Sequence, residues 1–378
     1  MAPGGARRTT MSRDPMRILL IGAGVRGRVW GKVCDEASDV SLCGVVDHMP
    51  ERAEALVAVL SRSEASAGTD PDEAIRRLRP EAVIVATPPD GHAGLVLMAM
   101  ARGCHVLCEK PLSNSLAQSE ELVEAAHRLG RHLLVGMNFR YLPVSQRIRR
   151  AVRERELGEP SFAQFHYIRF RDGRREDLND YPLSMPYPML WEQSIHHFDL
   201  LRYCYGQEVH SLVADSFHPS WSRYDGDCCV SVLFRFESGL RVNYLGTWTA
   251  SWNRMDFRWR SEFTDGVLLQ RQQFDDLVRV AFRPELGAHG ARFKGEADAE
   301  PAESEGLAAC VPLVDDSRAL LDEFSQAVRG GSEPVTTAAD HLKSVRLVQA
   351  CIDSIQARRW IDLAQAEGDS GSPAERAP

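Results

Sequence analysis

The stretch RILLIGAGVRG, residues 17–27, decides the fold of this chain. It begins with an apolar run typical of a buried strand, and Gly22, Gly24 and Gly27 then follow in G-x-G-x-x-G spacing. The first glycine of such a loop allows a tight turn, the second lets a pyrophosphate approach the backbone, and the third lets the helix pack closely on the strand. The stretch therefore predicts a strand, a phosphate-binding turn and a helix whose N-terminus faces the phosphates.

The same alternation between short apolar runs and segments of helical period continues to about residue 140. Further runs stand at 41–47, 81–87, 105–109 and 132–138. Strands that are apolar on both faces and alternate with helices indicate a parallel sheet covered on both sides. Their connections must be right-handed crossovers, which gives a doubly wound α/β domain over residues 16–140.

The pattern changes after residue 140, where strands of period two replace the buried apolar runs. Consecutive hairpins with few helices predict an α+β second domain, residues 141–365, built on a large and mainly antiparallel sheet. A polar loop rich in Tyr and Pro, residues 171–188, interrupts it. The predicted elements are helices at 144–157, 189–206, 317–329 and 338–358, a strand at 161–170, and hairpins over 228–250 and 256–270 with turns at 237–239 and 264–266.

Composition limits the remaining possibilities. Residues 1–15 predict a disordered extension, 366–378 a flexible tail and 287–308 a mobile loop, because all three contain few apolar residues.

A net charge of −8 without a long basic run disfavours nucleic acid as a partner. No apolar run approaches the roughly 18 residues that span a membrane, and the N-terminal stretch lacks the core of a secretory signal. Nine cysteines without a CxxC pair favour reduced thiols and a cytoplasmic location.

Asp47 ends the second apolar run, 25 residues after Gly22. A carboxylate at this place can accept hydrogen bonds from both adenosine ribose hydroxyls, and it would repel a 2′-phosphate. The alternative interpretation is a strand-end Asp that only stabilises its turn. With the glycine loop in place, Asp47 favours NAD over NADP as the cofactor, although His48 beside it could tolerate a phosphate.

Lys110 stands out because only four of the 45 basic residues are lysines. It follows the apolar run at 105–109 and precedes Pro111, at a strand end where ligands of doubly wound sheets bind. A lysine supplies an amine whose pKa can be changed by burial and neighbouring charge, which a guanidinium cannot supply. The position therefore predicts a functional lysine near the nicotinamide end of the cofactor, with a chance lysine at a strand end as the alternative.

The predicted helix at 189–206 carries Glu192, His196, His197 and Asp199. Glu192 and His196 are four residues apart and His196 and Asp199 are three apart, so each pair shares a face of a helix. A histidine satisfied within the helix core is the structural alternative. A zinc site is disfavoured because the chain has no HExxH motif and no further His/Cys pair at ligand spacing, so no metal is predicted.

From about residue 16 to 363 the sequence resembles the glucose-fructose oxidoreductase, inositol dehydrogenase and rhizopine-catabolism (Gfo/Idh/MocA) family. The stretches that carry the resemblance are IGAGVRG, VIVATPPDGHAG, CEKPLS, VGMNFRYLP, MLWEQSIHHFDLLRYCYG and SVRLVQACIDSIQARRWIDL. The resemblance implies an N-terminal Rossmann domain, a C-terminal open-faced sheet, and hydride transfer on sugars, inositols or related polyols. It also implies that Lys110 is the catalytic lysine, His196 the catalytic histidine and Glu192 the acid.

The chain departs from the D-x-G-x-H pattern of that family, with Glu192 for Asp and Ser194 for Gly. The extra methylene moves the carboxylate by roughly 1.5 Å, the length of one C–C bond. The resemblance and the motifs together give the candidate residues. The candidate cofactor contacts are Gly22, Gly24, Val25, Arg26, Gly27, Asp47, His48, Thr87, Pro88, His92, Glu109, Lys110 and Asn138. The candidate substrate contacts are Lys110, Tyr167, Tyr181, Tyr187, His196 and His197.

The first functional hypothesis is an NAD-dependent dehydrogenase of a sugar, cyclitol or related polyol. His196 would take the hydroxyl proton, Lys110 would hold the developing alkoxide and Glu192 would orient the base. The departure at Glu192 motivates an alternative, in which tightly bound NAD assists elimination, epimerisation or glycoside cleavage. A third hypothesis is a non-catalytic NAD-binding sensor.

The substrate and the assembly are less closely defined by the sequence. The arginines of the 171–188 loop fit a carboxylate or a phosphate, but contact with solvent is the preferred interpretation for them. A wide sheet whose outer face mixes polar and apolar residues predicts a homodimer or homotetramer formed through that face.

Overall fold

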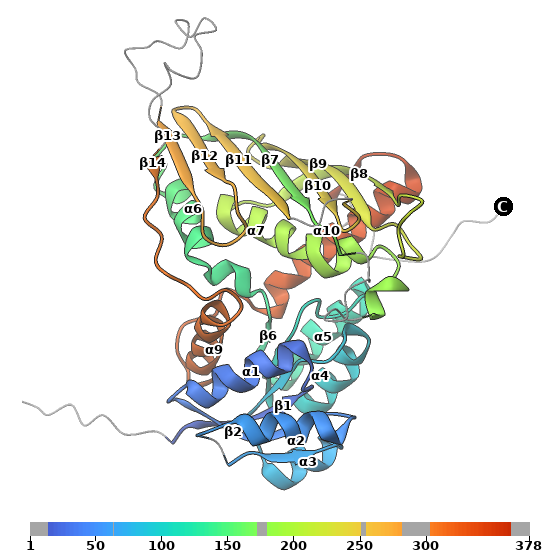
Figure 1. Ribbon diagram of the computed structural model, residues 1–378, viewed down its shortest axis with the longest axis vertical. Helices are drawn as coiled ribbons and strands as arrows, with labels where there is room; N and C mark the ends of the chain where they lie inside the picture. Colours follow the sequence, from blue (N-terminus) through green and yellow to red (C-terminus); the bar gives the residue numbers. More distant parts are fainter. Residues whose placement is uncertain (1–13, 63, 172–179, 251–254, 282–302, 364–378) are drawn as a thin grey trace, which may run out of the picture.

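The structure, a computed structural model, describes residues 14–62, 64–171, 180–250, 255–281 and 303–363. Figure 1 shows two domains stacked along the long axis, one with β1, β2 and helices α1 to α5, the other with a broad sheet above its helices. Residues 1–13 of the predicted extension, the whole predicted tail and residues 287–302 of the predicted mobile loop lie outside the described residues. No described helix has the length and apolar content that a membrane crossing requires.

The first domain is a six-stranded parallel sheet in the order β3-β2-β1-β4-β5-β6, which confirms the predicted doubly wound fold. One strand, β3, was not predicted because its residues, Ser-Ala-Gly, form no apolar run. The strands are β1 (Met16–Ile21), β2 (Val40–Val46), β3 (Ser66–Gly68), β4 (Ala82–Val85), β5 (His105–Cys108) and β6 (Leu133–Val135). The helices are α1 (Val25–Glu36), α2 (Pro50–Val59), α3 (Pro71–Leu78), α4 (His92–Ala101) and α5 (Leu116–Leu129).

Alternate residues of β1 enter two separate hydrophobic cores, one on each face of this sheet. Leu19 and Ile21 pack with apolar residues of α3, α4 and α5, whereas Ile18 and Leu20 pack with those of α1 and α2. The second core also takes Phe324 from α9 (Asp315–Val328). A helix late in the sequence therefore completes the cover of the first domain, beside α1 (Figure 1).

The turn between β1 and α1 requires glycine at two of the three positions of its G-x-G-x-x-G spacing. Gly22 has φ +100°, a left-handed value, and a Cβ there would lie 2.6 Å from the backbone oxygen of Ala86. A Cβ on Gly27 would lie 1.9 Å from the backbone oxygen of Gly22, so α1 approaches β1 only because this residue is glycine. A Cβ on Gly24 would meet no heavy atom within 4 Å of its position. The space beside Gly24 is therefore open.

The second domain is built on a nine-stranded sheet in the order β14-β13-β12-β11-β7-β10-β9-β8-β15. Neighbouring strands are antiparallel except for β7 and β10, which are parallel. The two predicted hairpins are β9–β10 and β11–β12, and Gly239 takes φ +96° in the first turn. The strands are β7 (Pro160–Ile168), β8 (Val209–Phe217), β9 (Cys229–Phe236), β10 (Arg241–Thr247), β11 (Asp256–Phe263), β12 (Gly266–Gln270), β13 (Val278–Ala281), β14 (Glu303–Ser304) and β15 (Ile361–Asp362).

One face of this sheet carries helices and the other is open, as predicted. Helices α6 (Pro143–Arg153), α7 (Ile195–Tyr205) and α10 (Ala338–Ala357) lie on the side that faces the first domain (Figure 1). In β9, Val232 and Phe234 are buried against them, whereas Leu233 between the two is 44% exposed. This alternation is typical of an antiparallel sheet with one covered face.

The helix predicted at 189–206 is not regular. It begins with a π-helical turn, Leu190–Ser194, in which the N–H of Ile195 bonds to the carbonyl oxygen of Leu190, five residues earlier. Regular α-helix follows, and it ends at Gly206, which takes φ +65°. The prediction of a single α-helix was therefore wrong over residues 190–194, because an apolar pattern at helical spacing does not reveal the one extra residue of a π-turn.

Candidate active site

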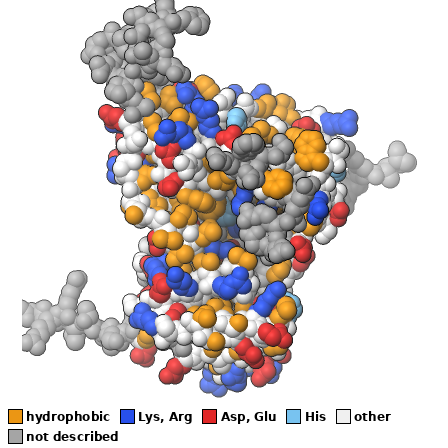
Figure 2. Space-filling view, in the orientation of Figure 1, with side chains coloured by type: hydrophobic (Ala, Val, Ile, Leu, Met, Phe, Trp, Pro, Cys, Tyr) orange, Lys and Arg blue, Asp and Glu red, His pale blue; other side chains and the backbone are white. Residues whose placement is uncertain are grey.

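A cavity of about 560 Å³ lies between the carboxyl ends of the first sheet and the start of α7. In Figure 2, apolar side chains gather at the mid-height of the molecule, where the two domains meet. Most of the predicted site residues line this cavity. From the first domain they are Gly22, Gly24, Val25, Arg26, Asp47, His48, Thr87, Pro88, Glu109 and Lys110, together with Asn138 at the start of the short helix η2 (Asn138–Tyr141). From the second domain they are Tyr181, Glu192 and His196.

The glycine turn fits the pyrophosphate of a dinucleotide. Helix α1 starts at Val25, and the open space beside Gly24 belongs to the cavity. The Nη1 atom of Arg26 is buried and has no hydrogen-bond partner among the described residues. Backbone N–H groups at a helix N-terminus and a guanidinium N–H that lacks an acceptor both suit phosphate oxygens.

Asp47 stabilises the glycine turn and also lines the cavity. Its carboxylate accepts hydrogen bonds from the backbone N–H groups of Ala23 (2.7 Å) and Met49 (2.9 Å), and it lies 3.1 Å from Nδ1 of His48. These bonds hold the glycine turn against the end of β2. The same buried carboxylate lines the cavity, where a ribose can reach it.

Glu109 connects the glycine turn to the strand end that carries Lys110. Its Oε1 accepts hydrogen bonds from Nε of Arg26 and from the indole N–H of Trp30, each at 2.7 Å. Burial opposes the ionisation of Glu109, but the Arg26 charge and these hydrogen bonds outweigh burial and lower its pKa. The residue is therefore a carboxylate that fixes Arg26 within the cavity.

Lys110, in the cavity wall, joins the two domains. Its Nζ donates to the backbone oxygen of Glu192 (2.8 Å) and lies 3.2 Å from the Oε2 atom of the same residue. The side chains of Lys110 and Glu192 are 14% and 6% exposed. The π-turn brings Glu192 to this position, in agreement with the frequent use of such turns at functional sites.

His196 lies in the first turn of α7, on the cavity wall. Its ring stacks on Phe139 with the ring centroids 4.3 Å apart. Burial, and then the positive charge of Lys110, lower its pKa well below the usual 6.5, so the imidazole is neutral and can accept a proton. Among the described residues, Nδ1 of His196 and Oε1 of Glu192 are both buried without a hydrogen-bond partner. A substrate hydroxyl is the kind of group that would satisfy them.

Tyr181 lines the cavity from the loop predicted at 171–188. Burial, and then the negative charge of Glu192, raise the pKa of its hydroxyl group. The hydroxyl therefore stays protonated and can donate a hydrogen bond to a ligand.

His197 and Tyr167 do not line the cavity, although both are candidate substrate contacts. The Nδ1 atom of His197 lies 2.8 Å from the hydroxyl of Tyr244, and its Nε2 lies 3.0 Å from the amide nitrogen of Gln193. Tyr167 donates to the amide oxygen of Gln193 at 3.3 Å. Burial lowers the pKa of His197 to about 3, so it is a neutral group of the core. Both side chains position Gln193, which does line the cavity.

His92, Gly27 and Tyr187 also lie outside the cavity wall. The ring nitrogens of His92 are 2.8 Å from the backbone oxygen of Pro111 and 2.9 Å from that of Thr87, so this buried residue joins the loops after β4 and β5. Gly27 serves the packing of α1, and Tyr187, with φ +52°, packs at the edge of the hydrophobic core of the second domain. In the part of the chain that the structure describes, no group of His, Cys, Asp and Glu side chains is arranged to hold a metal.

Several residues of the cavity wall were not predicted. Arg169 could have been identified, because it stands two residues after Tyr167 and therefore on the same face of an extended strand. Phe139, Gln193 and Phe274 carry no motif that marks them. The unpredicted wall residues are Arg52, Ala86, Pro89, Phe139, Arg169, Gln193, Gln273, Phe274 and Leu313.

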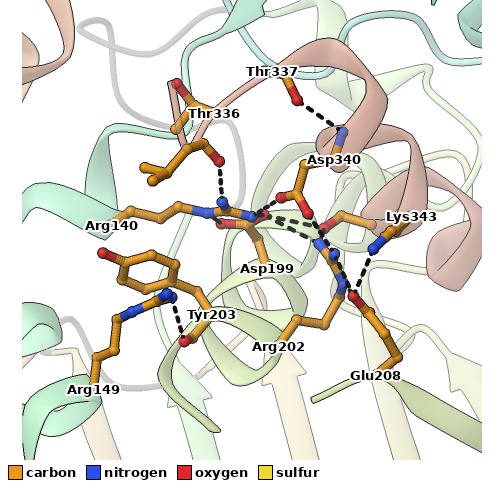
Figure 3. Close-up of polar contacts among 12 residues, drawn as sticks. Arg140, Arg149, Asp199, Arg202, Tyr203, Glu208, Thr336, Thr337, Asp340 and Lys343 are labelled. Atoms are coloured by element: carbon orange, nitrogen blue, oxygen red, sulfur yellow. Dashed lines mark hydrogen bonds and ion pairs between the residues drawn. The ribbon is translucent and has the colours of Figure 1, made fainter. Parts of the chain in front are cut away.

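Figure 3 shows a network of ion pairs around the buried side chains of Arg140 and Arg202. Arg140, directly after Asn138 and Phe139, donates to both carboxylate oxygens of Asp199 at 2.7 and 2.6 Å, and also to Asp340. Arg202 donates to Asp340 at 3.0 Å and to Glu208 at 2.6 Å. Asp199 therefore binds Arg140 and not His196, with which it shares a helix. The network fixes α7 and α10 to the segment that follows β6.

Two family models match this chain. Residues 16–137 match the oxidoreductase family with an NAD-binding Rossmann fold, and residues 145–268 match the GFO/IDH/MocA C-terminal domain. The chain is 25% identical over 377 residues to inositol 2-dehydrogenase of Rhizobium meliloti, covering 92% of this chain and 99% of that protein. It is 27% identical over 293 residues to D-apiose dehydrogenase of Paraburkholderia graminis, covering 76% and 74%.

A solved structure shows the same fold. It is an oxidoreductase from Agrobacterium radiobacter in complex with NAD+, L-tartaric acid and magnesium, with a TM-score of 0.80, 19% identity, and coverage of 93% of this chain and 99% of that one. The family models, the doubly wound first domain and the open-faced second sheet agree with one another, and the predicted cofactor is the one that the family model names. This chain belongs to the Gfo/Idh/MocA family of NAD-binding oxidoreductases.

Proposed function

We propose that this protein oxidises a secondary hydroxyl group of a sugar, cyclitol or related polyol with NAD, and catalyses the reverse reduction. The proposal rests on one observation: Lys110, Glu192 and His196 line the same cavity as the glycine turn, and Lys110 is hydrogen-bonded to Glu192. Relatives named inositol 2-dehydrogenase and D-apiose dehydrogenase support the class of substrate.

The residues of the cavity have separate tasks in this reaction. NAD supplies, when bound, the nicotinamide ring that exchanges a hydride with the substrate carbon. His196 accepts the hydroxyl proton, because its lowered pKa keeps the imidazole neutral. The ammonium group of Lys110 stabilises the negative charge that develops on the substrate oxygen. Glu192 holds Lys110 in position, and the protonated hydroxyl of Tyr181 is a further donor for the substrate.

The same proposal assigns tasks to the two parts of the chain. Residues 16–140 bind NAD, and residues 141–365 bind the substrate and form the contact between subunits. A homodimer or homotetramer through the open sheet face is supported by Phe162 and Leu233, which are 46% and 44% exposed there. A cytoplasmic location is supported by the nine cysteines, all of which are free thiols.

The test is the substitution Lys110→Met, which keeps the length of the side chain but removes its charge. The wild-type protein should produce NADH from NAD with at least one member of a panel of inositols, aldoses and uronic acids. Lys110→Met should lose about a hundredfold to a thousandfold in kcat, because one electrostatic donor to a developing oxyanion contributes that much. NAD affinity, measured by calorimetry, should stay within a few-fold of the wild-type value.

Other results would favour the other hypotheses. Product formation without NADH release, with NAD retained on the protein, favours NAD-assisted elimination, epimerisation or glycoside cleavage. NAD binding without turnover of any panel member, in both wild type and Lys110→Met, favours the sensor.

A further inference from the structure

Two arginines, Arg169 and Arg171, line the cavity, and the proposed reaction gives neither of them a role. They continue β7 beyond its last residue as an extended segment. The N–H of Arg169 bonds to the backbone oxygen of Thr247 and that of Arg171 to the backbone oxygen of Trp248. Residues two apart in an extended segment point to the same face, so both guanidinium groups lie on the side of Tyr167, toward α7.

Among the described residues, each guanidinium is positioned by an aromatic side chain and not by a carboxylate. Nη1 of Arg169 donates to the hydroxyl of Tyr167 at 3.3 Å, and that hydroxyl is itself bound to Gln193. The guanidinium of Arg171 lies over the indole of the fully buried Trp248, 4.4 Å from the ring centroid. Both side chains are partly buried. Stacking and a neutral hydrogen bond orient a guanidinium but leave its charge uncompensated.

The charges on the cavity wall do not balance at this end. Arg26 is paired with Glu109, and Lys110 is paired with Glu192. Within the described ranges, no carboxylate lies at ion-pair distance from Arg169 or Arg171, although both line the same cavity. The Cα atoms of two residues that stand two apart in an extended segment are roughly 7 Å apart, and like charges on the same face repel each other. A negatively charged ligand between them removes that repulsion.

The phosphates of the cofactor are not that ligand. The glycine turn and the N-terminus of α1 stand in the first domain, together with the unpartnered Nη1 of Arg26. Arg169 is linked instead through the Tyr167 hydroxyl to Gln193 in the π-turn of the second domain. Arg171 stands two residues further along the same segment and lines the same cavity. Asp47, to which we assign the ribose of the adenosine half, directly follows β2 in the first domain. The two arginines are therefore on the substrate side of the reacting groups.

We propose that the substrate carries an anionic group, a carboxylate or a phosphate, that Arg169 and Arg171 bind together. The substrate class is then an acidic sugar or a phosphorylated sugar or cyclitol, with a free secondary hydroxyl at Lys110 and His196. This inference rests on the proposed dehydrogenase function and makes it more specific. Guanidinium groups suit it because they donate in pairs to the oxygens of carboxylates and phosphates.

The experiment compares substrates that differ only in one group. D-glucose, D-glucuronate and D-glucose 6-phosphate form one set, and myo-inositol and myo-inositol 1-phosphate form another. Initial rates of NADH formation are measured for the wild type, Arg169→Gln, Arg171→Gln, Arg171→Lys and, as a control, Arg128→Gln on the exposed face of α5. The quantity compared is the ratio of kcat/KM for the anionic compound to that for its neutral partner.

We expect that at least one anionic compound is preferred over its neutral partner, and that each Arg→Gln change lowers this ratio by about tenfold or more, as the loss of a charge-assisted hydrogen bond does. Arg171→Lys should keep part of the preference, and Arg128→Gln should leave it at the wild-type value. Whether the carboxylate or the phosphate ratio responds shows which of the two groups is bound. Turnover of neutral compounds with ratios that no arginine variant changes overturns the inference but leaves the proposed function in place.

A second measurement separates the two proposals. Calorimetric binding of the same compounds to the Lys110→Met protein saturated with NADH does not depend on catalysis. If an anionic compound binds to Lys110→Met but not to Lys110→Met/Arg171→Gln, the arginine site is supported. This holds even if the wild type oxidises no compound, and then only the dehydrogenase proposal fails. Equal binding of anionic compounds to both proteins overturns the arginine site.

Discussion

The ammonium group of Lys110 lies 2.8 Å from the backbone oxygen of Glu192 and 3.2 Å from its carboxylate. Lys110 follows a strand of the first domain, and Glu192 belongs to the π-turn that precedes α7 in the second. The π-turn leads directly into α7, whose first turn carries His196, four residues after Glu192. In the proposed reaction, the first domain supplies Lys110 and the second supplies Glu192 and His196.

Shortening the acid should weaken this arrangement. Glu192→Asp withdraws the carboxylate by roughly one C–C bond, so Lys110 keeps the backbone oxygen but loses the Oε2 contact. We expect kcat to fall by about tenfold to a hundredfold, as for a misplacement of about 1 Å. Steady-state NADH formation measures this, and Glu124→Asp on the exposed face of α5 is the matched control. An unchanged or increased kcat would show that the carboxylate of Glu192 does not position Lys110.

The pH dependence of turnover should report the environment of His196. Because burial and Lys110 lower its pKa well below 6.5, the imidazole stays deprotonated throughout the neutral range. A general base must be deprotonated to act, so kcat/KM for alcohol oxidation should decline only as the pH falls well below 6.5. His196→Asn should lower the rate by about a hundredfold or more and abolish this decline. A half-maximal rate at pH 6.5 or above contradicts the assignment.

Two glycines of the turn, Gly24 and Gly27, should respond differently to substitution by alanine. Gly24→Ala adds a methyl group to open space, so the protein should fold with wild-type stability, but NAD affinity should fall because the pyrophosphate uses that space. Gly27→Ala places a Cβ 1.9 Å from the backbone oxygen of Gly22, so the protein itself should be destabilised. Thermal unfolding and NAD titration of both variants distinguish the two effects. Wild-type NAD affinity in Gly24→Ala would exclude this binding site.

The ion pair between Arg140 and Asp199 should contribute to the free energy of unfolding. Asp199, 1% exposed, binds Arg140 through both oxygens. Asp199→Asn leaves the Arg140 charge buried with one partner fewer, and we expect the free energy of unfolding to fall by about 3–5 kcal/mol. The control is Glu159→Gln, because Glu159 pairs with Arg155 on the surface, where ion pairs contribute less than about 1 kcal/mol. Equal losses in urea denaturation of the two variants would contradict this account.

Much of the fold follows from local sequence. The apolar runs around the glycine turn require burial on both faces, which only a covered parallel sheet provides. Gly22 and Gly27 stand where the backbone admits no Cβ, and the period-two stretches at 228–250 and 256–270 form hairpins because alternation permits one buried face. Short elements without an apolar pattern, such as β3 and β14, could not be predicted, since pairing with a neighbouring strand is what makes them strands.

The site depended more on tertiary structure. The sequence by itself determined that Lys110 ends a strand and that Glu192 and His196 lie within four residues of each other. It did not determine that His197 points into the core or that Arg169 faces the cavity. Two adjacent histidines look alike in the sequence, and only the packing of the folded protein decides which of them reaches the cavity. The π-turn and the ion pair between Lys110 and Glu192 arise where two domains meet. Contacts between residues 82 positions apart are set by the packing of those domains, and no local pattern contains them.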